Sequence, residues 1–585
     1  MRSRLHRPQT LTGGPVSEQV TESVQILQIE EIPPPALVRP VRRARAWPTA
    51  LAITLIAVVL LAAYYRLSWT VSVNSDGAAN IFQAWDMLHG NLLLHGWWLS
   101  DASFYTTELP QYALIEVLLG QVPAVIHLAS AMTYTLAIVL AAVLAKGKAT
   151  GWDGALRMAI AAGIMLAPQP GGGLFVGGGV FVLDLSLGHI GTAVPLLLAW
   201  LVLDRAGTRR WVPPAVGILL AWVLIADPLV TYVGILPVTL VYGLRAYRGV
   251  VVAHRPVASA WFEIAMAASA LAAFPAAMAV ASLLRSLGGF AVYPVNSVLA
   301  SGPSLVQNVT VTFQSLLTLF GANFLGMRLG LGVAAALLHL VGLVLAAWAM
   351  SLAVRRLLRG TGPGGTVDEV MAVAVLANLA VFVFSMLAID PSYAREIAIV
   401  LPLTAALAGR LLPERLVRAR LLPLLAAVLV GYTFTLLHGV VQPPAPTANQ
   451  QLAQWLVARN LRYGLGPYWE ASSVTLASDQ QVQVRPIDWA SHKIVGAYPW
   501  EADASWYDPA LHYADFVILD PRNPSYHADG TAWMVTNTFG KPADAYDVGP
   551  YRVLIWNKNL LTGLGCGTIA THPTGIASPA GPQCS

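Results

Sequence analysis

The segment Asn74-Ser75-Asp76-Gly77 holds the carboxylate of this chain that is best placed for acid–base chemistry. It follows directly after the first long apolar run, at about 47–65. A carboxylate a few residues beyond the hydrocarbon can take a proton from a bound hydroxyl, so Asp76 is a candidate general base. The alternative is structural: Ser75 or Asp76 caps the helix that follows, because both residue types accept hydrogen bonds from free backbone N–H groups. The sequence leaves both interpretations open.

Further acids recur at the ends of apolar runs that are predicted to face the same side as Asp76. A carboxylate this close to lipid is costly unless it faces a cavity or a partner. Acids from several separate segments at one depth therefore predict a shared polar cavity, although an Asp-Pro pair is also a common turn opener. The acids at span ends are Asp184, Asp227 and Asp390, and the loop after Asp76 adds Asp86 and Asp101.

Three arginines, Arg285, Arg328 and Arg395, fall at the predicted outer ends of apolar runs. This position runs against the general trend, which places basic residues in cytoplasmic loops. A guanidinium binds phosphate oxygens through paired N–H groups, so these arginines are candidates for holding a lipid phosphate. An ion pair, for example of Arg395 with Asp390 or Glu396, is the alternative.

The loop at 67–117 is also rich in aromatic residues and histidines. Trp97, Trp98 and Tyr105 are candidates for stacking on sugar or acceptor rings, and anchoring at the membrane interface explains them equally well. His89 and His95, near two of the acids, raise a possible divalent metal site, with headgroup contacts as the alternative. The sequence does not decide whether a metal takes part.

The composition shows which elements must position these residues. Of 585 residues 56% are hydrophobic and only 11% charged, and the mean hydropathy is +0.61. Soluble proteins have roughly a quarter charged residues, so most of this surface faces membrane lipids. The net charge of +5 comes from short basic clusters between apolar runs, which is a topology signal and does not indicate nucleic-acid binding.

The apolar runs predict about eleven membrane-spanning helices within residues 47–440. Lys and Arg cluster in alternate connections, which are therefore cytoplasmic. Residues 1–46 are then a disordered cytoplasmic tail, 67–117 is a large first outer loop, and the C-terminus lies outside the plasma membrane. The expected spans are 47–65, 118–145, 156–170, 189–203, 211–226, 229–244, 260–284, 329–353, 369–388, 397–411 and 421–440.

The charge of the C-terminal part agrees with this orientation. Residues 441–585 have eight basic and eleven acidic side chains, a net of −3, whereas the preceding 440 residues have +8. Residues 441–565 predict an extracytoplasmic α/β domain, and the tail 566–585 holds the only two cysteines, Cys566 and Cys584, as a candidate disulfide. The expected elements are a helix at 450–462 and strands at 473–477, 481–485, 516–519 and 551–556.

This arrangement resembles the membrane-embedded GT-C glycosyltransferases that use polyprenyl-phosphate-linked sugars. Asn74-Ser75-Asp76-Gly77 occupies the place of the catalytic aspartate in the first outer loop of that superfamily, and an amphipathic stretch follows it. The strings Gly466–Ala471 and Tyr551–Trp556 also look similar to the tails of uncharacterised actinobacterial members. The resemblance implies a polytopic α-helical membrane protein, GT-C-like, with a C-terminal extracytoplasmic α/β domain.

The resemblance also implies a mechanism. Asp76 would be the base of an inverting hexosyl or pentosyl transfer from a polyprenyl-phosphate donor to a glycan, lipid or protein acceptor. Arg395 and Arg285 would assist the leaving phosphate. Many members have two adjacent acids in the first loop, but here Gly77 follows Asp76, so the second acid is Asp86, Asp101 or an acid of another loop.

Two other classes of protein remain open at this point. A transporter or lipid-linked sugar flippase is the first, although transporters tend to place polar residues at the membrane midplane, where this chain has few. The second is a non-catalytic membrane protein whose outer domain binds a partner.

Overall fold

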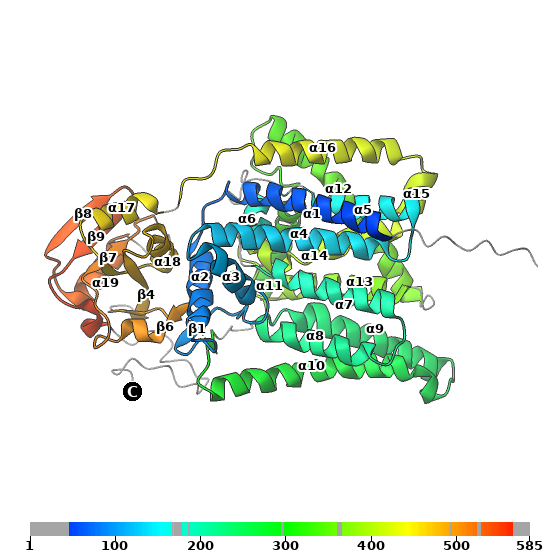
Figure 1. Ribbon diagram of the computed structural model, residues 1–585, viewed down its shortest axis with the longest axis horizontal. Helices are drawn as coiled ribbons and strands as arrows, with labels where there is room; N and C mark the ends of the chain where they lie inside the picture. The colour runs from blue at the N-terminus through cyan, green and yellow to red at the C-terminus, as the bar shows by residue number, and fades with distance from the viewer. Residues whose placement is uncertain are drawn as a thin grey trace, which may run out of the picture. The chain divides into compact units, whose positions relative to one another are not determined.

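The computed structural model describes residues 46–166, 168, 178–184, 188–293, 298–359, 365–447, 449–491, 494–522 and 528–564. Long helices account for most of the chain up to residue 440 (Figure 1). They are α1 Ala46–Ser68, α2 Ser75–Leu88, α3 Glu108–Leu119, α4 Ala124–Lys146, α5 Gly151–Met165, α6 Gly178–Asp184, α7 Ile190–Ala206, α8 Val212–Ala226, α9 Leu236–Tyr247, α10 Trp261–Ser286, α11 Gly302–Leu319, α12 Leu331–Arg359, α13 Thr366–Phe384, α14 Val400–Leu411, α15 Pro413–Arg418 and α16 Leu422–Val440.

Every predicted span overlaps one of these helices. Within the described ranges, seven helical segments are long and apolar enough to cross a membrane, and two shorter apolar helices, α8 and α14, accompany them. Large apolar side chains such as Val59, Ile218 and Phe434 are exposed on the helices, at 68%, 71% and 68% of their surface. Exposed apolar surface of this extent marks a lipid-facing protein. The seven segments are Trp47–Ser68, Ala124–Lys146, Thr231–Val252, Val257–Ser286, Leu331–Arg359, Thr366–Phe384 and Leu422–Val440.

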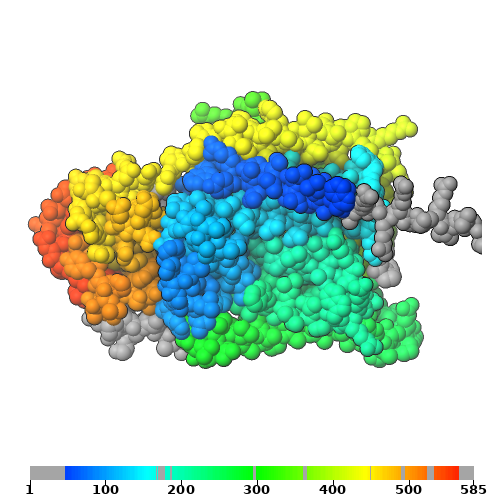
Figure 2. Space-filling view, in the orientation of Figure 1, coloured from blue at the N-terminus to red at the C-terminus, as the bar shows by residue number. Residues whose placement is uncertain are grey.

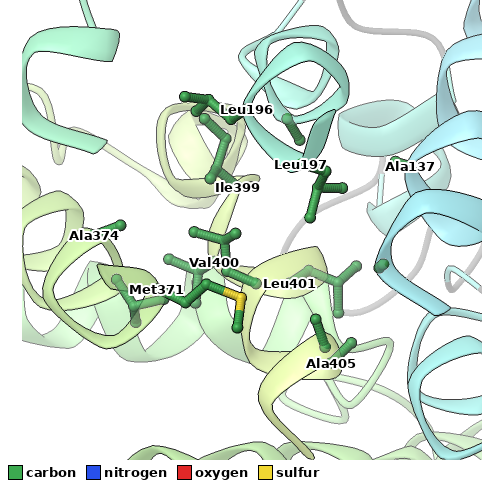
Figure 3. Close-up of a cluster of buried hydrophobic side chains, with 14 of the residues drawn as sticks. Ala137, Leu196, Leu197, Met371, Ala374, Ile399, Val400, Leu401 and Ala405 are labelled. Atoms are coloured by element: carbon green, nitrogen blue, oxygen red, sulfur yellow. The ribbon is translucent and has the colours of Figure 1, made fainter. Parts of the chain in front are cut away.

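The core of the helical region forms where α4, α7, α13 and α14 meet. Figure 3 shows Leu197 of α7, Met371 of α13 and Leu401 of α14 pointing toward one another. All three are 1% exposed or less. Because lipid is as apolar as these side chains, close packing and the polar contacts at the helix ends hold the bundle together.

The helix ends that were predicted to be cytoplasmic lie together. Arg410, at the end of α14, is 2.9 Å from Asp204 at the end of α7. Arg356 of α12 is 3.0 Å from Asp368 at the start of α13, and Arg410 also binds Asp368. The ends of four helices are therefore joined by ion pairs.

The C-terminal region contains a six-stranded sheet with the order β5-β4-β3-β7-β9-β8. Strands β3, β4 and β7 are parallel, and β5, β8 and β9 are antiparallel to their neighbours. The predicted strands at 516–519 and 551–556 are confirmed, whereas the strand at 473–477 was wrong, because these residues end a helix that connects β3 to β4. The elements are α17 Gln450–Ala458, β3 Tyr463–Gly466, α18 Tyr468–Ala477, β4 Gln483–Ser491, β5 Ile494–Ala497, β7 Phe516–Leu519, α19 Ala528–Phe539, β8 Asp544–Val548 and β9 Tyr551–Ile555.

A second, small sheet joins three distant segments in the order β2-β1-β6. Strand β1 (Trp97–Leu99) lies in the first loop, β2 (Ala291–Val292) follows α10, and β6 (Ala502–Asp503) belongs to the C-terminal region. Helix α2 packs on α3 and on α18. In the space-filling view the blue atoms of the first loop meet the yellow and orange atoms of the C-terminal region (Figure 2). The first loop and the C-terminal region therefore form one packed surface around the start of α2.

Candidate active site

Asp76 lies in the first turn of α2, and the helix is capped by a different residue. Asn74 is in an extended conformation, and its side-chain oxygen accepts a hydrogen bond from the Gly77 N–H at 3.0 Å. Ser75 donates its hydroxyl to the Trp469 carbonyl instead, at 2.9 Å. The interpretation of Ser75 or Asp76 as the cap is therefore wrong, and the Asp76 carboxylate is available for contacts outside its own helix.

Two side chains from distant segments contact this carboxylate. The Tyr468 hydroxyl lies 2.5 Å from Asp76 Oδ1. Nη1 of Arg395 lies 3.4 Å from Oδ2. The Asp76 side chain keeps 13% of its surface exposed, so a substrate hydroxyl can approach it.

Arg395 lies on the 3₁₀-helix Pro391–Ile397, which precedes α14. Besides Asp76, it contacts Glu396 through Nε at 3.5 Å and lies over the Tyr393 ring, 5.5 Å from its centroid. Burial opposes the charge, but Asp76 and Glu396 raise the pKa of Arg395 above its ordinary value. The guanidinium is thus a permanent cation beside the candidate base. An ion pair with Glu396 was one of the alternatives predicted for Arg395, and the structure contains that pair together with the one to Asp76.

A histidine continues this chain of charges. Nδ1 of His189 lies 2.7 Å from Asp227 Oδ2, and its Nε2 lies 2.7 Å from Glu396 Oε2. Neutral imidazole has only one N–H, so two carboxylate contacts indicate an imidazolium. Burial opposes ionisation of Asp227, but the His189 charge lowers the pKa of that carboxyl below its ordinary value. Thr192 donates a further hydrogen bond to Asp227.

The predicted acids separate into two groups. Asp101 belongs to the cluster: burial and then the Glu396 charge raise its pKa, while His189 and Arg395 lower it. Asp227 also belongs, through His189. Asp86 accepts hydrogen bonds from Trp97 Nε1 at 2.8 Å and Asn91 Nδ2 at 2.6 Å, ten residues further along α2 from Asp76. Asp390 is exposed and caps the 3₁₀-helix.

The other candidates lie outside the immediate surroundings of Asp76. Arg285, at the end of α10, and Arg328 are both exposed, and within the described residues neither forms an ion pair. Trp97 and Trp98 are each 3% exposed in β1, and Trp97 packs edge-on against Trp506. These two tryptophans belong to the folded core of the loop.

Three more predicted features concern Tyr105, the metal and the disulfide. Tyr105 packs on Phe290 and donates its hydroxyl to the Leu92 carbonyl at 3.0 Å. In the part of the chain that the structure describes, no group of three or more His, Cys, Asp or Glu side chains is arranged to hold a metal ion. Nδ1 of His95, one of the two histidines considered for such a site, forms a hydrogen bond with the Gly288 carbonyl. Cys566 and Cys584 lie outside the described residues.

Two residues of the site were not predicted from the sequence. Tyr468, at the start of α18, contacts Asp76, and the same hydroxyl lies 2.8 Å from Glu501 Oε2. Burial and then the Asp76 charge raise the pKa of Glu501 well above its ordinary value. Tyr468 lies in the string Gly466–Ala471 and Glu501 follows Trp500, but neither residue type nor spacing distinguished these two positions in the sequence.

The fold is that of a multi-pass membrane protein of the GT-C type. It is similar to two crystal structures of ArnT from Cupriavidus metallidurans. Against the structure bound to undecaprenyl phosphate, the TM-score is 0.50 at 12% sequence identity, covering 87% of this chain and 98% of that chain. Against the apo structure, the TM-score is 0.50 at 12% sequence identity, covering 89% of this chain and 99% of that chain. No family model and no curated protein matches the chain, so the similarity of its tail to actinobacterial members stays a prediction.

Proposed function

We propose that this protein is a GT-C glycosyltransferase that transfers a sugar from a polyprenyl-phosphate donor to an acceptor outside the plasma membrane. The observation that carries the proposal is the pair formed by Asp76 and Arg395, a carboxylate and a fixed cation 3.4 Å apart. Two supports accompany it: the fold of the chain, and the undecaprenyl phosphate that is bound in one of the similar ArnT structures.

The chemistry follows from these two residues. Asp76 takes the proton of an acceptor hydroxyl as that oxygen attacks the anomeric carbon. The bond from this carbon to the phosphate oxygen breaks, and the pair of electrons leaves with the polyprenyl phosphate. Attack from the face opposite the leaving group inverts the configuration of the sugar.

Arg395 supplies the charge that the leaving group needs. Its described contacts use Nη1 and Nε, which leaves Nη2 for a phosphate oxygen. Glu396 contacts the guanidinium and is itself held by His189, so the donor meets a cation that is already in place. The transition state has oxocarbenium character, and nearby carboxylates such as Asp101 stabilise its positive charge.

The acceptor is a glycan, a lipid or a protein hydroxyl, and the transferred sugar is a hexose or a pentose. The N-terminus is cytoplasmic and the C-terminal domain extracytoplasmic in this proposal. This side suits a lipid-linked donor, because nucleotide sugars are confined to the cytoplasm.

The deciding experiment is transfer of labelled sugar from polyprenyl-phosphate donors by the purified full-length protein. Asp76→Asn is expected to lower the rate by roughly 10² or more, the scale of lost general-base catalysis. Asp479→Asn, a change at an exposed site of the C-terminal region, is the control and is expected to leave the rate unchanged. Equal rates in wild type and Asp76→Asn would remove Asp76 as the base. A wild type inactive with every polyprenyl-phosphate sugar would contradict the proposed class and favour transport or binding.

A further inference from the structure

The Tyr468 hydroxyl lies between a carboxyl oxygen of Asp76 and one of Glu501. These three oxygen atoms share too few protons for both carboxyl groups to be ionised. The Tyr468 hydroxyl lies 2.5 Å from Asp76 Oδ1 and 2.8 Å from Glu501 Oε2. A phenol has a single proton and donates it to one acceptor. If both carboxyl groups were ionised, the Tyr468 oxygen would face one of the two carboxylate oxygens with no proton between them, and the lone pairs of the two oxygens would repel each other. One of the carboxyl groups is therefore protonated.

The surroundings of the two carboxyl groups decide which one holds the proton. Asp76 is partly exposed and pairs with Arg395. Glu501 is 2% exposed, and within the described residues it forms no ion pair with a cation. Burying a charge without a partner is costly, so Glu501 is the neutral acid. Its proton points to the Tyr468 oxygen, and the Tyr468 proton points to Asp76.

The fold holds Glu501 in this place at a conformational cost. Its φ angle is +50°, in the left-handed region that costs an ordinary residue about 1 kcal/mol or more. The next residues form β6, which pairs with β1 in the register Trp98↔Ala502, and the Ala504 N–H bonds the Gly96 carbonyl at 2.9 Å. Strain that persists because neighbouring structure enforces it is typical of functional positions.

Tyr468 is fixed just as firmly. It opens α18, and the next residue, Trp469, accepts the Ser75 hydroxyl through its carbonyl. The Ser473 N–H in turn donates to the Ser75 hydroxyl at 3.3 Å. Ser75, the residue that precedes Asp76, therefore connects the start of α2 to α18 through these two hydrogen bonds.

We propose that Tyr468 and a protonated Glu501 are positioning residues that orient the Asp76 carboxylate, so that the C-terminal region completes the active site. This inference rests on the proposed role of Asp76 as the base. The relay, by which we mean the hydrogen bonds from Glu501 to Tyr468 and from Tyr468 to Asp76, holds Oδ1 of Asp76. It directs Oδ2, the oxygen next to Arg395, to the acceptor hydroxyl. The groups that face the relay are Ser100, Asp101, Arg395 and Glu396.

The test compares variants that keep or remove each hydrogen bond of the relay. Tyr468→Phe is expected to lower kcat about tenfold or more, the scale of a lost hydrogen bond to a charged group, with little change in KM. Glu501→Gln keeps a donor toward Tyr468 and is expected to stay within about twofold of the wild type. Glu501→Leu removes the donor and is expected to resemble Tyr468→Phe.

Tyr513→Phe, at an exposed tyrosine of the same region, is the matched control. Gel filtration and thermal unfolding of each full-length variant identify any change that acts through folding alone. A Tyr468→Phe variant with the kcat of the wild type would overturn the proposal. So would a Glu501→Gln variant as slow as Glu501→Leu, because Glu501 would then act as an ionised group.

A measurement without turnover separates this inference from the proposed function. The infrared spectrum of the wild type minus that of Glu501→Gln, at neutral pH, is expected to show the C=O band of a protonated carboxyl group. If the band is present and no donor is turned over, the relay stands and the proposed function fails. If only a carboxylate band is lost, the relay is wrong whatever the activity.

Discussion

The Tyr468 hydroxyl lies 2.5 Å from Oδ1 of Asp76, although 392 residues separate the two in the chain. One residue follows the first predicted span and the other lies beyond the last one, so the contact joins two regions that are separated by all the other spans. The C-terminal region therefore contacts the first loop at the candidate base itself.

Arg395→Lys is expected to weaken donor binding although it keeps the charge. The guanidinium contacts Asp76 through Nη1 and Glu396 through Nε, a geometry that a single ammonium group does not reproduce. We expect KM for the polyprenyl-phosphate donor to rise about tenfold or more, the scale of a lost charge-assisted contact. Steady-state kinetics and competition by the free polyprenyl phosphate measure this. Arg418→Lys, at an arginine 81% exposed, is the control. An unchanged donor KM in Arg395→Lys would exclude Arg395 as the phosphate ligand.

His189→Gln is expected to destabilise the protein, because it leaves Asp227 and Glu396 without the cation between them. Asp227 is fully buried, and removal of one partner from a buried ion pair costs about 3–5 kcal/mol. The double variant His189→Gln/Asp227→Asn removes the uncompensated charge and is expected to recover part of the loss. The midpoint of thermal unfolding measures both, with His254→Gln as the exposed control. If the single and double variants unfold at the same temperature, the imidazolium assignment is wrong.

Glu470 is expected to make the C-terminal region less stable as the pH rises. Burial and then the Asp520 charge raise the pKa of this carboxyl to about 8. In the unfolded chain the group ionises at its ordinary, lower pKa, so the folded state binds the extra proton between the two values. Stability is therefore full below the ordinary pKa and falls by about 1.4 kcal/mol per pH unit up to about 8.

Glu470→Gln should remove this slope, because the amide does not titrate. Thermal unfolding at several pH values between 5 and 8 is the measurement, and Glu414→Gln, at a side chain 74% exposed, is the control. An identical pH dependence in wild type and Glu470→Gln would show that Glu470 is not protonated in the fold.

Much of the helical architecture follows from the sequence, because long apolar runs and basic clusters depend only on the membrane. Each predicted span overlaps a helix, and the position of Asp76 just after the first run needed no tertiary information. Arg395 was likewise identified from its place at the end of a span. These residues are set by local sequence and by the two faces of the bilayer.

Contacts between segments did not follow from the sequence. Tyr468 and Glu501 acquire their roles only when α18 and β6 pack on the first loop. The strand predicted at 473–477 rested on Val474 and Thr475, but packing of α18 on α2 and β4 overrides that β preference. The paired Trp97 and Trp98 suggested ring stacking on a substrate, whereas pairing of β1 with two distant strands buries them.

Gly409 of α14 lies close to the backbone of α5, and enlarging it tests the packing of the described helices. A Cβ atom at Gly409 of α14 would lie 2.4 Å from the Arg157 carbonyl oxygen of α5 and 2.7 Å from the Cβ of Ala145. The carbonyl belongs to a helix backbone, so relief requires a shift of the whole helix. Gly409→Ala is therefore expected to cost about 1–3 kcal/mol, the usual range for an overpacked core. Gly243→Ala, where an added Cβ meets nothing within 4 Å, is the matched change on α9 and is expected to leave the midpoint of thermal unfolding unchanged or slightly higher. Equal midpoints for the two variants would mean that α14 and α5 do not pack as closely as described.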